Sequence, residues 1–122
     1  MDDGMLLVFT NSVEGRDEDF NKWYDTRHIG DILKVPGIVA AQRYELAPMT
    51  LPEGDDAPAE LPPPAHRYLT IYTISGDPDA VMKEFLQRAG TDQLELSDAL
   101  DLTTVSVAAW RPRGQCHSAE AR

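Results

Sequence analysis

Hydrophobic and polar positions along the chain predict the order strand, helix, strand, strand, helix, strand. Residues 5–10, Met-Leu-Leu-Val-Phe-Thr, form a short continuous apolar run, which is typical of a strand buried on both faces. Residues 38–46 alternate between two faces, and residues 67–75 are rich in β-branched and aromatic residues, so both are predicted strands. Residues 102–110 supply the last predicted strand.

The first predicted helix spans about residues 17–35. Acidic residues at its start favour a helix N-terminus, and Pro36-Gly37 ends it. Ile29 and Leu33 lie on the side of an ideal helix opposite to its other apolar residues. The pattern therefore predicts a bend or break near Gly30.

The second predicted helix begins at Asp77-Pro78 and ends near Gly90, and residues 92–100 are expected to add a short helical turn. The resulting β-α-β-β-α-β order predicts an α+β, ferredoxin-like fold, with a four-stranded antiparallel sheet and two helices on one face. The other face stays apolar and should be buried against something. A second copy of the chain is the simplest cover, so we expect a homodimer through the sheet faces.

Charge suggests how the second and third predicted strands pair. If residues 38–46 and 67–75 run antiparallel, placing Glu45 opposite Arg67 brings unlike charges together. The same register sets Tyr44 opposite Tyr68 and predicts that these tyrosines share a face with Tyr72.

Residues 1–111 are predicted to form a single domain, followed by a flexible C-terminal tail over residues 112–122. Within the domain, residues 47–65 hold six of the nine prolines together with several acidic residues. This composition predicts a long loop without regular structure. It is either a tolerated insertion or a lid over a pocket mouth, and the insertion is favoured because the loop carries few groups for binding.

Composition and charge narrow the class of protein. Eleven Lys and Arg against 21 Asp and Glu give a net charge of −10 over 122 residues, which disfavours binding to nucleic acid or to an anionic membrane surface. The lone Cys116 allows no intramolecular disulfide. The first residues lack the basic region of a signal peptide, and no apolar run has membrane-spanning length. We expect a soluble cytoplasmic protein.

Candidate proton-transfer chemistry lies on one side of the first predicted helix, where Phe20, Tyr24, His28 and Asp31 fall together. His28 is the predicted general base or acid, because an imidazole ordinarily titrates at about pH 6.5. Asp31 is expected to hold one ring nitrogen, and Tyr24 to hydrogen-bond a substrate carbonyl or enolate. The plainer alternative is a histidine that only hydrogen-bonds at a helix bend.

Other side chains are candidates for substrate binding. Trp23 is either packing or a ligand platform, Arg27 either a cation for an anionic substrate or a salt-bridge partner, and His66 a second acid or base. A further aromatic set either lines a cavity or forms the dimer interface: Tyr44, Tyr68, Tyr72 and Trp110. The adjacent Cys116 and His117 fall short of a metal site, and the chain has no phosphate loop, nucleophile elbow or Cys-x-x-Cys pair, so neither a metal nor a cofactor is predicted.

The motif Trp23-Tyr-x-x-x-His28, followed by Val35-Pro-Gly37 and by Ala41-Gln-Arg-Tyr44, resembles the EthD-like branch of the dimeric α+β barrel superfamily. The stretch Asn11-Ser-Val-Glu-Gly-Arg16 adds to this likeness. The resemblance covers residues 5–110 and is sharp over residues 11–44. Relatives commonly have Pro two residues after the motif histidine, whereas this chain has Gly30.

The resemblance implies a homodimer of two sheets packed face to face, with a small apolar ligand between sheet and helices. Activities in similar proteins include cofactor-independent isomerases, polyketide cyclases, dehydratases, and oxygenases that need no metal or flavin. We therefore predict a cofactor-independent lyase, isomerase or cyclase that performs acid/base chemistry on a small apolar metabolite bearing a carbonyl or hydroxyl. The alternatives are a cofactor-free monooxygenase and a non-catalytic small-molecule-binding protein.

Overall fold

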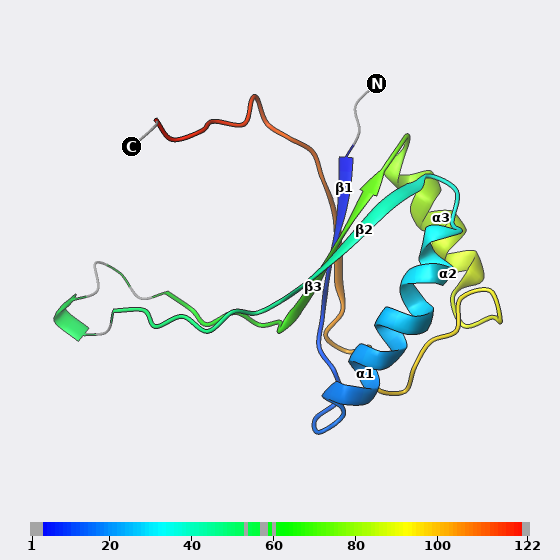
Figure 1. Cartoon of the computed structure of the whole chain (residues 1–122), viewed down its shortest axis with the longest axis horizontal. Coiled ribbons are helices and arrows are strands. Elements are labelled where there is room, and N and C mark those ends of the chain that lie inside the picture. Colours follow the sequence, from blue (N-terminus) through cyan, green and yellow to red (C-terminus); the bar gives the residue numbers. More distant parts are fainter. Residues whose placement is uncertain (1–3, 53, 57–58, 60, 121–122) are drawn as a thin grey trace.

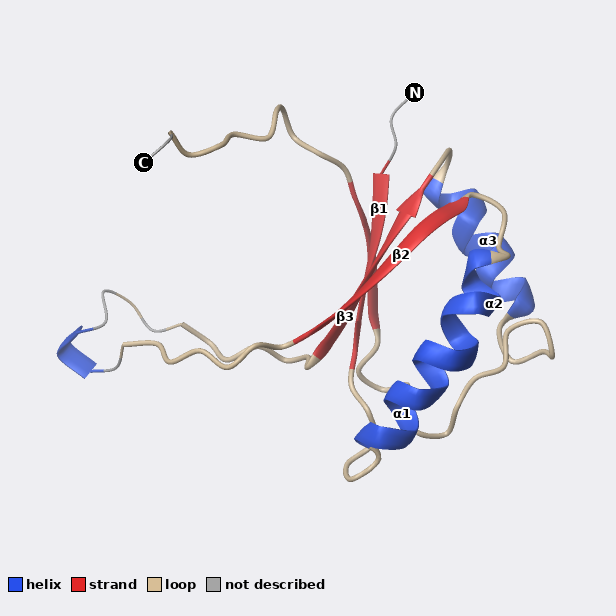
Figure 2. Ribbon diagram, in the orientation of Figure 1, coloured by secondary structure: helices blue, strands red, loops and turns tan. Residues whose placement is uncertain are grey.

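The protein is an α+β structure in which a four-stranded antiparallel sheet carries helices on one face (Figures 1 and 2). The coordinates are a computed structural model that describes residues 4–52, 54–56, 59 and 61–120. The strands lie in the order β2-β3-β1-β4, with β1 at Gly4–Thr10, β2 at Ile38–Glu45, β3 at Tyr68–Ile74 and β4 at Ser106–Trp110. This arrangement is compatible with the predicted ferredoxin-like fold.

The first helical stretch is continuous and contains one irregular turn. It consists of α1 (Asp17–Trp23), a π-helical turn η1 (Tyr24–His28) and α2 (Ile29–Leu33). Both residues at the junctions, Trp23 and Ile29, keep right-handed helical backbone angles. A bend or break was predicted near Gly30. The helix does not break there, since Gly30 lies inside α2, and its irregularity is the π turn that ends two residues earlier, at His28.

The second helix, α3 (Pro78–Arg88), begins as predicted, with the Asp77 side chain accepting a hydrogen bond from the Asp79 amide at 3.1 Å. It packs close to the turn before β2. Gly37 there has a φ of +94°, and a Cβ at this position would lie 2.6 Å from Cγ2 of Val81. Glycine is thus required both by the backbone angle and by the approach of α3.

The structure differs in detail from two sequence predictions near the C-terminal end of the domain. Residues 92–100 form turns and isolated bridges, with no helix, and β4 is shorter than the predicted strand. The side chain of Asp101 explains the late start of β4. It accepts hydrogen bonds from the amide of Thr103 at 3.0 Å and from its hydroxyl at 2.6 Å, which fixes a turn.

The register between β2 and β3 differs by one residue from the prediction. Glu45 lies opposite Tyr68, and Ala41 lies opposite Tyr72. Arg67 instead forms an ion pair with Asp17 on α1, with a distance of 2.7 Å. Because successive strand residues point to opposite faces, this register turns Tyr44 away from the face that carries Tyr68 and Tyr72.

The core lies between the sheet and the helices, while the other face of the sheet is open (Figure 1). The open face carries the residues that alternate with the buried ones: Met5, Leu7, Phe9, Tyr44, Leu69, Ile71, Ala108 and Trp110. The described part of residues 47–65 projects away from the body and contains the short 3-10 helix η2 (Gly54–Asp56). Residues 111–120 form an extended tail without helix or strand.

Candidate functional site

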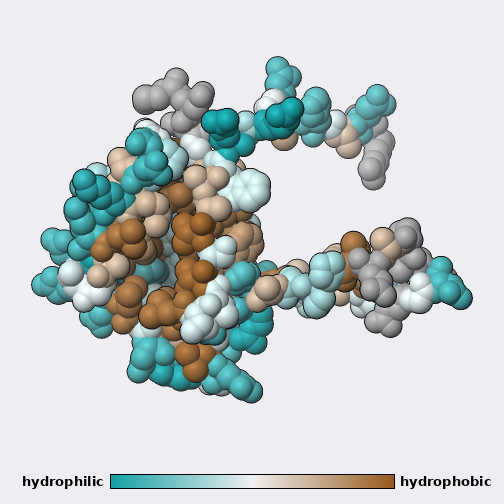
Figure 3. All heavy atoms as spheres, turned by 180° about the vertical axis from the view of Figure 1, so that it is seen from behind, coloured by the Kyte–Doolittle hydropathy of each residue, from teal (hydrophilic) through white to brown (hydrophobic). Residues whose placement is uncertain are grey.

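An apolar cavity of about 230 Å³ lies between the sheet and the helices. Figure 3, which views the molecule from behind, shows apolar side chains gathered around a hollow. The walls come from all four strands, from α2 and α3 and from the segment before β4, and the π turn contributes two polar rings, Tyr24 and His28. The apolar lining consists of Leu6, Val8, Ile32, Ile38, Val81, Met82, Phe85, Leu86, Ala89, Leu96, Leu100, Leu102, Val105 and Val107.

The π turn explains why both rings face the sheet. In a regular α-helix of 3.6 residues per turn, residues four apart drift steadily around the axis. A π turn takes up one more residue than an α turn and offsets this drift. As a result, Phe20, Tyr24, His28 and Ile32 are all at most 5% exposed, although they follow a strict four-residue spacing.

The imidazole of His28 is buried and lacks a hydrogen bond on one nitrogen. Among the described residues, Nδ1 has no partner. The ring stacks on Trp23, with ring centroids 4.3 Å apart, and meets Tyr24 edge-on at 4.7 Å. Burial, helped by the nearby charge of Arg43, lowers the pKa of His28 to about 4 despite the opposing effect of Asp31. The imidazole is therefore neutral at physiological pH.

Tyr24 and Tyr72 form a buried pair of phenols beside this imidazole, and both line the cavity. Their hydroxyl oxygens are 2.7 Å apart, so one O–H donates to the other oxygen, and the buried side chain of Thr70 also hydrogen-bonds to the pair. Burial raises the pKa of both phenols, so both stay protonated. The guanidinium of Arg43 lies 4.3 Å from the centre of the Tyr24 ring.

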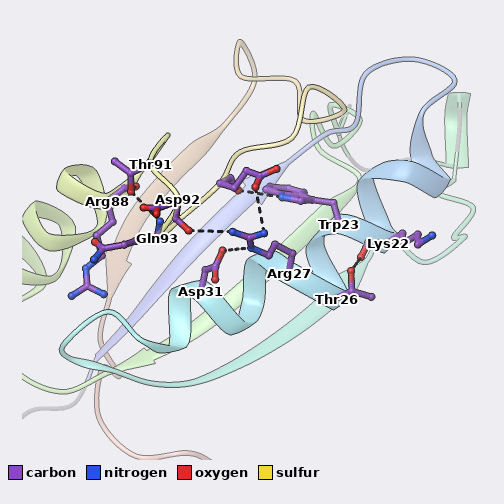
Figure 4. A network of polar contacts seen from close by, with 10 residues as sticks. Lys22, Trp23, Thr26, Arg27, Asp31, Arg88, Thr91, Asp92 and Gln93 are labelled. Atoms are coloured by element: carbon purple, nitrogen blue, oxygen red, sulfur yellow. Dashed lines mark hydrogen bonds and ion pairs between the residues drawn. The ribbon is translucent and has the colours of Figure 1, made fainter.

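Asp31 does not take the position predicted for it. Its Oδ2 lies 2.9 Å from Nε of Arg27, and among the described residues the carboxylate does not hydrogen-bond to His28 (Figure 4). It is also absent from the cavity lining. Asp31 thus acts on the imidazole only through its charge, which opposes the pKa-lowering effect of burial.

Trp23 and Arg27, predicted to bind substrate, lie outside the cavity (Figure 4). They instead connect the first helical stretch to the loop that follows α3. The indole Nε1 of Trp23 donates to the main-chain oxygen of Glu95 at 3.2 Å. Arg27 donates to the main-chain oxygen of Asp92 at 3.1 Å and pairs with the Glu95 carboxylate at 3.3 Å.

Of the other aromatic candidates, only Tyr72 reaches the cavity. Tyr68 donates to Asp17 at 2.7 Å, while Tyr44 and Trp110 are about half exposed on the open face. His66 lies 2.6 Å from the main-chain oxygen of Thr104 and, like Tyr44 and Tyr68, borders a separate groove at the base of the projecting segment. No described residue of 47–65 lines the cavity, so this segment does not act as its lid in this structure.

Two features of the cavity were missed by sequence reasoning. Thr10, at the end of β1, lines the cavity, and its buried Oγ1 has no hydrogen-bond partner among the described residues. The leucines at positions 96, 100 and 102 cover the cavity from a segment with no helix or strand, so no periodic pattern marks them.

Within the described residues, no cluster of three or more His, Cys, Asp or Glu side chains is arranged to hold a metal ion. The described helices include none with the length and apolar character needed to cross a membrane. Comparisons with protein-family models, with curated proteins and with solved structures found no match for this chain. Fold and site together define an α+β protein with an apolar cavity, and its wall presents a neutral imidazole.

Proposed function

We propose that the protein performs cofactor-independent proton transfer on a small, neutral, largely apolar metabolite bearing a carbonyl or hydroxyl. The observation that carries this proposal is the neutral imidazole of His28 at the wall of an apolar cavity of about 230 Å³. An engineered apolar cavity of about 150 Å³ binds benzene, so this cavity suits a substituted or fused ring compound. An anionic ligand is disfavoured because none of the described residues that line the cavity is charged.

The proposed reaction begins when His28 takes a proton from the carbon next to a carbonyl. The C–H electron pair moves to the carbonyl oxygen and forms an enolate, while the imidazole becomes an imidazolium. The O–H of Tyr24 or Tyr72 that does not donate within the phenol pair stabilises the enolate oxygen. The imidazolium then returns its proton to another carbon in an isomerisation, or to a leaving hydroxyl, which departs as water, in a dehydration. In a cyclisation the enolate carbon instead attacks a second carbonyl of the same molecule, and the imidazolium protonates the alkoxide oxygen that this forms.

We further propose that the chain is EthD-like and forms the face-to-face homodimer of the dimeric α+β barrel. The motif from Trp23 to His28 and the compatible fold support the family assignment. The open sheet face supports the dimer, because the apolar run of β1 matches a strand buried on both faces while the single chain buries only one.

A second candidate function is binding without catalysis. It is favoured by the same imidazole, because a pKa of about 4 makes a weak base and no carboxylate among the described residues is hydrogen-bonded to its Nδ1. Such a protein would carry an apolar metabolite and release it unchanged.

Deuterium incorporation from D2O separates these functions without knowledge of the natural substrate. Neutral cyclic ketones such as 2-tetralone are incubated with the protein, and exchange at the carbon next to the carbonyl is followed by NMR. The proposed enzyme accelerates exchange, and His28→Gln lowers that rate by about 100-fold or more. Ketones that bind without faster exchange in either protein would support the carrier and refute the enzyme. Oxygen uptake during turnover would indicate a monooxygenase instead.

A further inference from the structure

The orientation of the His28 ring is set by neighbouring rings. With Nδ1 unpartnered among the described residues, no hydrogen bond on that nitrogen fixes the imidazole. The Trp23 indole lies against its face at 27° between planes, and Tyr24 stands at 85° to it. An imidazole flanked in this way cannot rotate without displacing one of these rings.

The indole of Trp23 is itself held in place from outside the helix. Its N–H donates to the main-chain oxygen of Glu95, and its ring also packs near Phe20, with centroids 6.1 Å apart. Arg27, one turn further along, binds the same loop through the Asp92 carbonyl and the Glu95 carboxylate. Figure 4 shows these contacts converging on one short stretch of main chain.

That stretch belongs to the roof of the cavity. We define the roof segment as residues 91–105, which contribute Leu96, Leu100, Leu102 and Val105 to the lining. Glu95, the acceptor for the indole, directly precedes Leu96 in the chain. The side chain of Trp23 therefore links the roof segment to the imidazole by direct contact with both.

We propose that Trp23 is the positioning residue of His28: its indole, anchored on the Glu95 carbonyl, keeps the imidazole turned toward the cavity while the roof segment is closed. The inference deepens the function proposed for this cavity and rests on it. Trp23 touches no part of the cavity, so it acts only through His28 and the roof segment. A purely structural role would contribute packing energy without affecting the state of the imidazole.

Two substitutions separate these roles, with a matched control. Trp23→Leu removes the stacked ring, whereas Trp23→Phe keeps an aromatic ring but lacks the N–H donor. Trp110→Leu makes the same change in the other tryptophan, on the open face of the sheet. The groups that influence His28, namely Tyr24, Asp31 and Arg43, are present in all three variants.

The test is NMR of the histidine side chains of the full-length chain between pH 8 and 5.5, with the His28 signal assigned by its loss in His28→Gln. In the parent and in Trp110→Leu the imidazole stays neutral at pH 5.5, because its pKa is about 4. In Trp23→Leu the freed ring gains water, so its pKa rises by about one pH unit or more and protonation becomes visible by pH 5.5. A folded Trp23→Leu protein whose imidazole stays fully neutral would overturn the inference.

Trp23→Phe keeps the proposal falsifiable if Trp23→Leu does not fold. Loss of the bond to Glu95 is expected to speed amide exchange at residues 94–96 by about fivefold, the equivalent of one hydrogen bond. His28 resonances should shift at the same time. Unchanged amide exchange in the roof segment, together with unchanged His28 resonances, would refute the proposed connection between the roof segment and His28 through Trp23.

Failure of the inference can be distinguished from failure of the proposed function. If 2-tetralone binds the parent and exchanges deuterium while His28 is insensitive to Trp23, only the positioning role is wrong. If the parent shows no His28-dependent exchange, the proposed chemistry is wrong, whatever the state of the ring in the variants.

Discussion

Replacing His28 with leucine should stabilise the protein, because the imidazole occupies a site that favours an apolar side chain. His28 is 5% exposed and its Nδ1 has no hydrogen-bond partner among the described residues. A buried polar atom without a partner costs about 1–3 kcal/mol, and leucine is apolar and of similar size. We therefore expect His28→Leu to raise the free energy of unfolding at pH 7 by about 1–2 kcal/mol, allowing for imperfect packing of the new side chain.

The stabilisation by His28→Leu should grow as the pH falls, because the pKa of His28 is lower in the folded protein than in the unfolded chain. Between pH 6.5 and pH 4 the unfolded chain protonates His28 while the folded chain does not, so the parent loses stability as the pH falls. With a folded pKa of about 4 and an unfolded pKa of 6.5, this loss amounts to about 2 kcal/mol at pH 5. His28→Leu removes it, so the stabilisation at pH 5 should exceed that at pH 7 by about 2 kcal/mol.

Urea denaturation at pH 7 and pH 5, followed by circular dichroism, measures both quantities. His66→Leu is the matched control, because His66 Nε2 lies 2.6 Å from the Thr104 carbonyl oxygen and is only partly buried. Loss of that contact should lower stability by about 1 kcal/mol. A His28→Leu protein that is less stable than the parent at both pH values would refute the account of the imidazole as a buried group without a partner.

Four further predictions follow from the same geometry. Tyr24→Phe removes one O–H of the phenol pair, so it should lower stability by about 1 kcal/mol in urea titrations and slow deuterium exchange of 2-tetralone by about tenfold or more. Ala89→Leu puts a larger side chain into the cavity wall, so 2-tetralone should bind about tenfold more weakly by NMR titration while exchange of bound ketone still depends on His28. Leu7→Lys places a charge on the open face, and light scattering should then report a monomer where the parent is a dimer; a monomeric parent would contradict the proposed interface. Arg27→Gln removes the ion pairs to Asp31 and Glu95, so amides of residues 92–96 should exchange faster, and unchanged protection there would count against a role for Arg27 in holding the roof segment.

The fold class was predictable because its signals are local. The period-2 pattern of the strands, the amphipathic helices and the glycine and proline positions between them each predict one element, and their order limits the topology. The register of β2 against β3 was not predictable from charge alone. Arg67 has a partner on α1, in Asp17, which lies far from it in sequence and outweighs the expected pairing with Glu45.

The candidate site was predicted in part. The helix face with Tyr24 and His28 was recognised, but the means by which both rings face inward was not, since a π turn has no simple sequence pattern. A bend or break was expected near Gly30 because glycine weakens helices and because Ile29 and Leu33 leave the apolar side of an ideal helix. The irregularity lies instead in the π turn just before Gly30. The predicted hydrogen bond between Asp31 and the His28 ring is not formed, because the Asp31 carboxylate accepts a hydrogen bond from Arg27, one turn earlier in the helix.

The central claim is that the neutral imidazole of His28 borders a cavity that accepts a ring compound. Intermolecular nuclear Overhauser effects between bound 2-tetralone and the full-length protein test it most directly. We predict contacts from the ketone ring to the Cε1–H of His28 and to the methyl groups of Leu96, which line the same cavity. Contacts confined to the open face around Trp110, or the absence of binding at millimolar ketone, would contradict it.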